Sequence, residues 1–296
     1  MRNRNWLISL ILGGCLLFSL FSSAVTAVEP EVVLSTTIVR PGDFFQIKVQ
    51  AAHQSLVRVM FQGGSKMLPE SDPETFIGLL AVSDETDPDF YPLGVEITKD
   101  QNVVTALYRI QVIERKFPED RVTMDEKIQK TIFTSSNQEA DSKKTQEVRQ
   151  KAAMEAKLPL WRGPFIWPVK GPITTEFGFT RYINNIPEGR HSGIDIAASQ
   201  GTPVLATNDG RVVFAGKLYL TGWTVIIHHG LDLYSSYGHL SAIKVQEGEN
   251  VVKGDLIGLV GSTGLATGPH VHFTFKIGEI AVDPHLFLDQ EVGWKF

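Results

Sequence analysis

Residues 251–273 read VVKGDLIGLVGSTGLATGPHVHF, and this stretch decides how the C-terminal part of the chain folds. Glycines recur every three or four residues in its first half, and short apolar runs between glycines are typical of short strands joined by tight turns. Gly268-Pro269 then indicates a tight backbone entry into a last strand. Because strand residues two apart point to the same face, we expect His270 and His272 to project into one groove while Val271 points into the core.

The β-rich pattern extends over residues 161–296, which we interpret as one domain. Thr224 to His228 is an apolar run of strand length. Asp209-Gly210 is a hairpin signal, and it predicts that the runs Val204–Thr207 and Val212–Ala215 pair with one another. Neither a convincing long helix nor an internal repeat is visible in this segment.

Histidine is distributed unevenly, because seven of the eight histidines lie at or after position 191. His191 and Asp195 form an H-x-x-x-D pair, and His270 and His272 form an H-x-H pair. Two neutral imidazoles and one carboxylate suit a catalytic zinc, since they leave the fourth tetrahedral position open for water. Either motif alone is weak, and a lone H-x-H is more often structural. Together, within their glycine framework, they predict a metal site.

Residues from about 164 to 284 resemble the lysostaphin/LytM-type zinc endopeptidases, a family of peptidoglycan hydrolases. The matching segments run in the family's order and cover nearly the whole C-terminal domain. They are WPVKGPITTEFGFTR (167–181), HSGIDIAASQGTPVLATNDGRVVFAG (191–216), VIIHHG (225–230), SSYGHLS (235–241), VVKGDLIGLVGSTGLATGPHVHF (251–273) and VDP (282–284). The peptidase resemblance does not include the first 160 residues. It implies a mainly β fold with a compact antiparallel β domain and a long zinc groove.

The resemblance implies a role for each of five positions. His191, Asp195 and His272 would bind one Zn2+ per chain, and His239 and His270 would be catalytic. The implied reaction is hydrolysis of peptide bonds in peptidoglycan stems or crosslinks, for cell-wall remodelling. The chain has no H-E-x-x-H motif whose Glu could serve as base, and a histidine, with an ordinary pKa of about 6.5, can take that part.

Three other polar residues near the motifs are candidate groove residues. Arg181 and Asn184 precede His191 and could contact substrate. Tyr237, beside His239, either lines the groove or packs in the core. His228 and His229 are expected at a turn, with one of them lining the groove as the alternative, and His285 is expected at a structural or exposed position.

Residues 28–116 predict an immunoglobulin-like β-sandwich. The runs Phe45–Val49 and Tyr108–Val112 alternate apolar and polar residues, and this period marks strands with one buried face. Several turn signals separate such runs, as in a small sandwich. The segment contains one histidine, His53, and no cluster of catalytic residue types. We interpret it as a spacer or targeting module, for which an envelope protein is a candidate partner.

Residues 117–160 differ in composition from the segments on either side. They are rich in Lys, Glu, Gln, Asp and Ser, and Glu139 to Lys157 contains good helix formers with no Pro or Gly. We predict a charged, partly helical linker with a solvated face. An alternative is that this linker folds over the active site and restrains it.

Residues 1–27 have the pattern of a signal peptide. Arg2 and Arg4 precede an apolar run from Trp6 to Phe21, and Val25-Thr26-Ala27 fits a cleavage site. The alternatives are a retained membrane anchor and lipidation at Cys15. Export to the cell envelope, either the periplasm or the cell-wall space, is therefore expected. Cleavage would remove the only cysteine, so a metal would be held by His, Asp or Glu.

Charge and the filled motifs exclude or weaken several functions. A net charge of −5 and a pI near 5.9 are unlike those of a basic nucleic-acid binder, so no nucleic acid is expected as a partner. Some relatives are non-enzymatic amidase activators that have lost metal ligands, but all five positions are filled here. A wall-binding scaffold and a bacteriocin that attacks polyglycine bridges are further alternatives.

Overall fold

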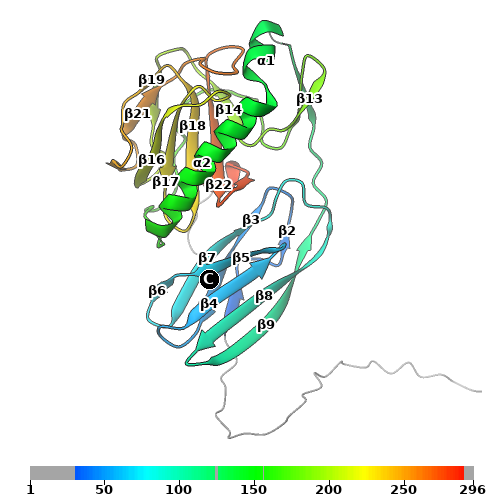
Figure 1. Ribbon diagram of the computed structural model, residues 1–296, viewed down its shortest axis with the longest axis vertical. Coiled ribbons are helices and arrows are strands. Elements are labelled where there is room, and N and C mark those ends of the chain that lie inside the picture. The colour runs from blue at the N-terminus through cyan, green and yellow to red at the C-terminus, as the bar shows by residue number, and fades with distance from the viewer. Residues whose placement is uncertain (1–30, 124–125, 156, 290–296) are drawn as a thin grey trace, which may run out of the picture.

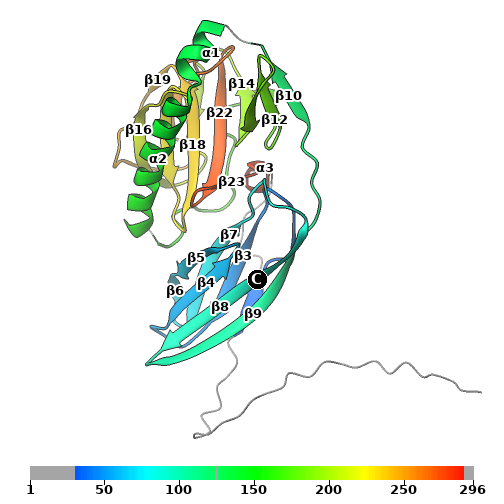
Figure 2. The same ribbon diagram turned by 45° about the vertical axis from the view of Figure 1, so that its right-hand side comes forward.

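The structure, a computed structural model, describes residues 31–123, 126–155 and 157–289. The predicted signal peptide, with its alternatives of a membrane anchor or lipidation at Cys15, lies outside these residues. Among the helices of the described residues, none has the length and apolar character needed to cross a bilayer. The chain is mainly β, as predicted, with two stacked β units and a linker that runs along the second (Figures 1 and 2).

The N-terminal unit consists of two sheets around one core. One sheet has the order β1-β3-β7-β6 and the other β2-β9-β8-β4-β5. The strands are β1 Val32–Leu34, β2 Ile38–Val39, β3 Phe44–Gln50, β4 Leu56–Phe61, β5 Gly64–Leu68, β6 Glu70–Asp72, β7 Thr75–Ala81, β8 Asp89–Lys99 and β9 Asn102–Val112. The apolar positions read from the sequence are fully buried in β3 (Phe45, Ile47 and Val49), but the polar Gln46 between them is buried as well. The assignment of this unit as immunoglobulin-like stays a prediction.

Strand β7 contributes to the cores of both units. Phe76 and Leu80 pack in the N-terminal core, whereas Ile77, Leu79 and Ala81 pack in the C-terminal core. A strand with both faces buried has no polar alternation, and β7 reads TFIGLLA for that reason. The N-terminal unit is thus docked on the C-terminal unit by apolar packing.

Polar and aromatic contacts extend this interface. The rings of Phe44 and Phe287 stack with centroids 4.6 Å apart, and Lys66 Nζ lies 2.8 Å from Asp232 Oδ2. Arg115 pairs with Asp283. These contacts add to the apolar packing between the two units.

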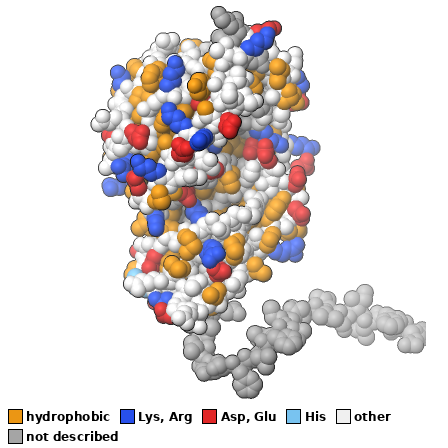
Figure 3. All heavy atoms as spheres, viewed as in Figure 1, with side chains coloured by type: hydrophobic (Ala, Val, Ile, Leu, Met, Phe, Trp, Pro, Cys, Tyr) orange, Lys and Arg blue, Asp and Glu red, His pale blue; other side chains and the backbone are white. Residues whose placement is uncertain are grey.

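The linker contains β10 (Glu119–Val122), α1 (Glu126–Ile132) and α2 (Ser135–Glu155). Helix α2 confirms the predicted helical segment and packs its Val148 and Ala152 on the sheet. Its Arg149 is buried and pairs with Glu279, while Tyr234 donates a hydrogen bond to the Arg149 carbonyl. The face that carries α2 mixes basic and acidic side chains (Figure 3), so the predicted solvated face and a docked face occur on the same helix.

The C-terminal unit is built on an eight-stranded sheet of order β11-β14-β22-β18-β17-β16-β20, with β23 added beside β22. A three-stranded sheet β15-β21-β19 packs with it, and β10 joins a further sheet, β10-β12-β13. The elements are β11 Ile173–Thr175, β12 Thr180–Ile183, β13 Ile186–Arg190, β14 Ile194–Ala197, β15 Pro203–Leu205, β16 Gly210–Lys217, β17 Trp223–His228, β18 Leu233–Leu240, β19 Ala242–Ile243, β20 Asn250–Val251, β21 Leu256–Leu259, β22 His270–Ile277, β23 Ile280–Val282 and α3 His285–Leu288.

The prediction of a hairpin at Asp209-Gly210 is wrong. Strand β15 pairs with β21, whereas β16 pairs with β17 and β20. The turn instead carries the chain from one sheet to the other. It is held there because the Asp209 carboxylate accepts a 2.8 Å hydrogen bond from the Lys253 N–H, and the Asp209 carbonyl accepts a 2.7 Å bond from His229 Nδ1.

Candidate active site

Two neighbouring strands bring the predicted motifs together. Strands β14 and β22 are antiparallel, and Asp195 lies directly opposite His272 in their register. On β22, Val271 is fully buried in the core while His270 and His272 lie on the other face. The predicted orientation of the H-x-H pair is therefore confirmed, and the pairing of β14 adds a carboxylate to the same face.

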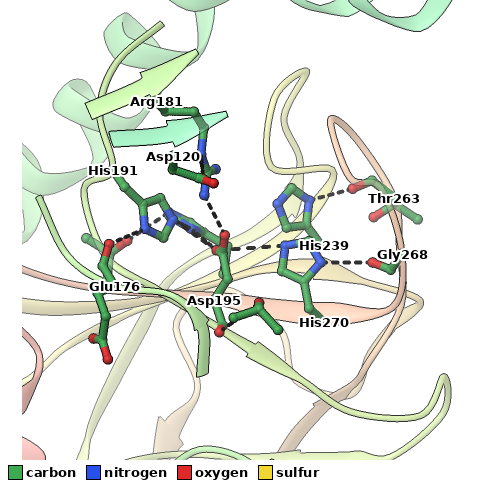
Figure 4. A network of polar contacts seen from close by, with 12 residues as sticks. Asp120, Glu176, Arg181, His191, Asp195, His239, Thr263, Gly268 and His270 are labelled. Atoms are coloured by element: carbon green, nitrogen blue, oxygen red, sulfur yellow. Dashed lines mark hydrogen bonds and ion pairs between the residues drawn. The ribbon is translucent and has the colours of Figure 1, made fainter. Parts of the chain in front are cut away.

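His191 completes a cluster of three side chains (Figure 4). Its Nε2 lies 3.0 Å from Asp195 Oδ1 and 3.0 Å from His272 Nδ1. His272 Nδ1 lies 2.9 Å from the same Asp195 oxygen. Three potential ligand atoms, one from each residue, thus form a nearly equilateral triangle within a largely buried site.

The chemistry of this triangle fits a metal ion. His191 Nδ1 donates a 2.9 Å hydrogen bond to the Glu176 carbonyl, so in the neutral ring Nε2 presents a lone pair. That lone pair faces a carboxylate oxygen, and a cation between them would remove the repulsion. Ligand atoms about 2.0–2.2 Å from one tetrahedral zinc lie about 3.3–3.6 Å apart. The observed spacing is slightly contracted from that arrangement, and the donor set of two imidazoles and a carboxylate suits zinc.

The electrostatics favour the ligand forms of these side chains. Burial acts to raise the pKa of Asp195, but the adjacent imidazoles of His191 and His272 outweigh it and hold that pKa well below its usual range. Burial lowers the pKa of His272 to about 4, against the opposing effect of Asp195. An ionised carboxylate beside a neutral imidazole is the state that binds a metal ion.

His239 and His270 have matched orientations beside the cluster. His239 Nδ1 donates to the Thr263 carbonyl at 2.7 Å, and His270 Nδ1 donates to the Gly268 carbonyl at 2.8 Å. In the neutral form of each ring Nε2 is then the acceptor, and His270 Nε2 lies 3.8 Å from Asp195 Oδ1. Their ring centroids are 4.6 Å apart, and the pKa of His239 is lowered to about 3 by burial and by the nearby His270 and His272.

The backbone of His239 is held in an unusual conformation. Its φ is +60°, in the left-handed region that non-glycine residues populate sparsely. The His239 N–H donates a 2.6 Å hydrogen bond to the Thr221 carbonyl. Sparsely populated backbone conformations persist where surrounding contacts determine them. In this backbone conformation the imidazole of His239 lines the groove.

These residues line one groove of about 440 Å³. Its lining includes Thr174, Arg181 and Arg190, and also Leu220 and residues 265–269. Val122 of the linker strand β10 also lines it. All five predicted site residues lie in this groove: His191, Asp195, His239, His270 and His272.

Of the three other candidate groove residues, the structure places one in the groove and two outside it. Arg181 lines the groove, and Arg181 Nη2 donates to Asp195 Oδ2 at 2.8 Å. Asn184 lies in the turn between β12 and β13 with φ +49°, and it is not among the residues that line the groove. Tyr237 is fully buried and accepts a hydrogen bond from the Thr207 N–H, so it packs.

The three other histidines of this domain are not among the residues that line the groove. His228 and His229 are buried rather than exposed in a turn, and burial lowers the pKa of each to about 4. His285 forms ion pairs with Glu176 and Asp289. Sequence reasoning missed two linker acids that act on the groove, Asp120 and Asp141, because a charged linker alone gives no signal for its contacts.

Several known proteins are similar in sequence to this domain. The family model described as Peptidase family M23 matches residues 189–284. The DD-carboxypeptidase/endopeptidase Mpg of Neisseria meningitidis serogroup B is 48% identical over 112 residues, which are 38% of this chain and 26% of Mpg. The murein hydrolase activator NlpD of Escherichia coli K12 is 37% identical over 134 residues, which are 45% of this chain and 32% of NlpD. The chain thus spans about a quarter to a third of the length of these relatives.

A solved structure extends the likeness beyond this domain. The crystal structure described as a peptidase M23 from Pseudomonas aeruginosa has a TM-score of 0.60 and 26% sequence identity. The match covers 84% of this chain and 94% of that chain. The similarity of fold therefore includes residues well outside 189–284.

Proposed function

Residues 189–284 match the model of Peptidase family M23, and on that premise we propose that the chain is a zinc-dependent endopeptidase that hydrolyses peptide bonds in peptidoglycan stems or crosslinks. The observation that carries the proposal is the triangle of His191 Nε2, Asp195 Oδ1 and His272 Nδ1. Beside this triangle lie the imidazoles of His239 and His270, each of which donates its Nδ1–H to a backbone carbonyl. That arrangement supplies three ligands and two bases in one groove.

In this proposal His191, Asp195 and His272 hold one Zn2+. Zinc, when bound, lowers the pKa of a water molecule from about 15.7 to near 7, which supplies a nucleophile at neutral pH. His239 and His270 transfer the proton of the attacking water. In the neutral ring, the Nε2 of each can accept a proton from the attacking water and return it to the leaving amine. Such acid–base catalysis contributes about 10²–10⁴-fold in rate.

The groove supports a peptide substrate. Its lining includes hydroxyl-bearing residues such as Thr174, Thr175 and Thr221, together with Arg190, which is exposed. An extended chain lying here would place a carbonyl beside the ligand cluster. Peptidoglycan as the substrate and export to the cell envelope are parts of this proposal, and the similarity to Mpg and NlpD supports them. The docked N-terminal unit offers a surface for an envelope protein partner.

A second candidate function is activation of another murein hydrolase, which the 37% identity to NlpD favours. The enzyme is preferred because this chain has all five side chains of a hydrolytic site in one groove. An activator would need neither the ligand triangle nor the oriented imidazoles.

The test is mass spectrometry of muropeptides after the purified full chain meets purified peptidoglycan, with and without a zinc chelator. We expect a chelator-sensitive loss of crosslinked dimers, and the masses released identify the bond. A matched reaction with His239→Ala should leave the dimers intact. A zinc-loaded chain that leaves the wall unchanged, yet raises the activity of an added murein hydrolase, would establish the activator instead.

A further inference from the structure

The two carboxylate oxygens of Asp195 have different surroundings. Oδ1 faces His191 and His272, whereas Oδ2 accepts a 2.8 Å hydrogen bond from Arg181 Nη2. Figure 4 shows the guanidinium of Arg181 reaching toward Asp195 from above the site. One oxygen is therefore directed to the candidate metal position and the other is already occupied.

Arg181 is itself oriented by an acid from the linker. Its Nε lies 3.0 Å from Asp120 Oδ2. Asp120 lies on β10, which pairs in parallel with β12, and the register sets Asp120 directly opposite Arg181. The three side chains are partly to deeply buried, with exposed fractions of 21% for Asp120, 18% for Arg181 and 7% for Asp195.

We propose that Asp120 and Arg181 are positioning residues for the metal site, and that the linker strand β10 thereby completes the active site. The proposal rests on the zinc site of the proposed function. Arg181 holds Oδ2, so Asp195 presents Oδ1 alone to the metal. Asp120 fixes the planar guanidinium, whose fork matches carboxylate geometry and loses little freedom once it is oriented.

The physical expectation is that of other groups that orient metal ligands. Removing the hydrogen-bond partner of a ligand typically costs about 10–100-fold in metal affinity or activity. Asp120 is one step further away than Arg181, so its removal should have the smaller effect. A purely structural role, in which the ion pairs only attach β10 to β12, would alter unfolding without altering zinc affinity.

The experiment compares zinc affinity in the full chain as wild type, Asp120→Asn, Arg181→Gln and the double variant. Apoprotein is titrated with zinc against a chromophoric chelator, and thermal unfolding of each apoprotein confirms that it is folded. The matched control is Glu119→Gln, since Glu119 lies on the same strand, is exposed, and pairs with Arg121 rather than with the site. Arg181→Lys, which keeps the charge without the fork, serves if Arg181→Gln does not fold.

We expect zinc to bind about 10-fold more weakly to Asp120→Asn and up to about 100-fold more weakly to Arg181→Gln. Glu119→Gln should bind zinc as the wild type does. Because Asp120 acts through Arg181, the double variant should bind zinc no more weakly than Arg181→Gln does. In the variants at these two positions, kcat should fall by a larger factor than KM changes.

Two outcomes separate this proposal from the proposed function. A wild-type chain that binds no zinc overturns the zinc site itself. A wild-type chain that binds zinc, with Asp120→Asn and Arg181→Gln binding it as tightly as Glu119→Gln does, overturns the positioning role and leaves the zinc peptidase standing.

Discussion

The carboxylate of Asp141 accepts a 2.8 Å hydrogen bond from the backbone N–H of Leu220. Asp141 lies in the first half of linker helix α2, and Leu220 lines the groove of the C-terminal unit. The second oxygen of Asp141 accepts a 2.9 Å bond from the Tyr219 N–H. On the far side, the Leu220 carbonyl accepts a 2.7 Å bond from the Leu265 N–H of another groove segment. The linker therefore supports this wall of the groove as well as the Arg181 side.

Asp141→Ala is expected to loosen this wall. Two hydrogen bonds to an ionised acceptor are lost, and hydrogen bonds to charged groups contribute about 1.5–3 kcal/mol each at most. We expect a lower midpoint of urea unfolding and a KM for peptidoglycan fragments raised several-fold, with zinc content unchanged. Glu139→Ala, an exposed position on the same helix, is the control. An unchanged KM in a destabilised Asp141→Ala chain would limit Asp141 to a structural role.

His191→Ala and Asp195→Ala are each expected to abolish both zinc binding and hydrolysis. Each substitution removes one of three ligand atoms that lie within 4.8 Å of one another, and two remaining ligands do not make a tetrahedral zinc site. Metal analysis of the purified variants by mass spectrometry measures this. His285→Ala, outside the groove, should retain one zinc per chain. Full zinc occupancy in either ligand variant would contradict the assignment.

His239→Ala is expected to keep its zinc and lose most of its rate. The imidazole lies beside the cluster, with its ring centroid 6.0 Å from that of His272, and in the proposed function it acts as a base rather than as a ligand. The loss should be about 10²–10⁴-fold in kcat. Metal content and kcat are measured on the same preparation. A folded His239→Ala chain without zinc would assign His239 to the metal instead.

His228 is expected to make the fold sensitive to acid. Burial lowers its pKa to about 4 in the folded chain, whereas unfolding restores a pKa of about 6.5. Above pH 6.5 both states are neutral and His228 has no effect on the pH dependence of stability. As the pH falls from about 6.5 to about 4, the unfolded state gains a proton that the folded state does not, so the free energy of unfolding decreases.

The matched variant is His228→Phe, which keeps the ring stacked on Tyr234 and replaces a buried Nε2 that has no partner among the described residues. Urea unfolding is measured at pH 7 and pH 4.5. The variant should lose about 2–3 kcal/mol less of its free energy of unfolding than the wild type does, because each pH unit between about 6.5 and 4.5 costs the wild type about 1.4 kcal/mol. Equal losses in both proteins would mean that His228 is protonated in the folded chain.

Local patterns predicted the strands well and the contacts between segments poorly. Alternation in Phe45–Val49 identified β3, because the direction of a strand side chain depends only on the local backbone. The Asp209-Gly210 turn was misread because the same turn can join strands of one sheet or of two. Strand β7 gave no alternation to read, since the second unit buries its other face.

The sequence by itself determined the chemistry of the site: which residue types are present, and that His270 and His272 share one face of a strand. Strand geometry sets that face within two residues. Only the tertiary structure decided that Asp195 lies opposite His272, that Asp120 meets Arg181 across β10 and β12, and that Asp141 supports the Leu220 wall. These contacts join segments that are distant in the sequence. Whether such segments meet depends on strand register and on how the linker packs. Both are set by the whole fold, so the local sequence shows no periodic pattern that predicts them.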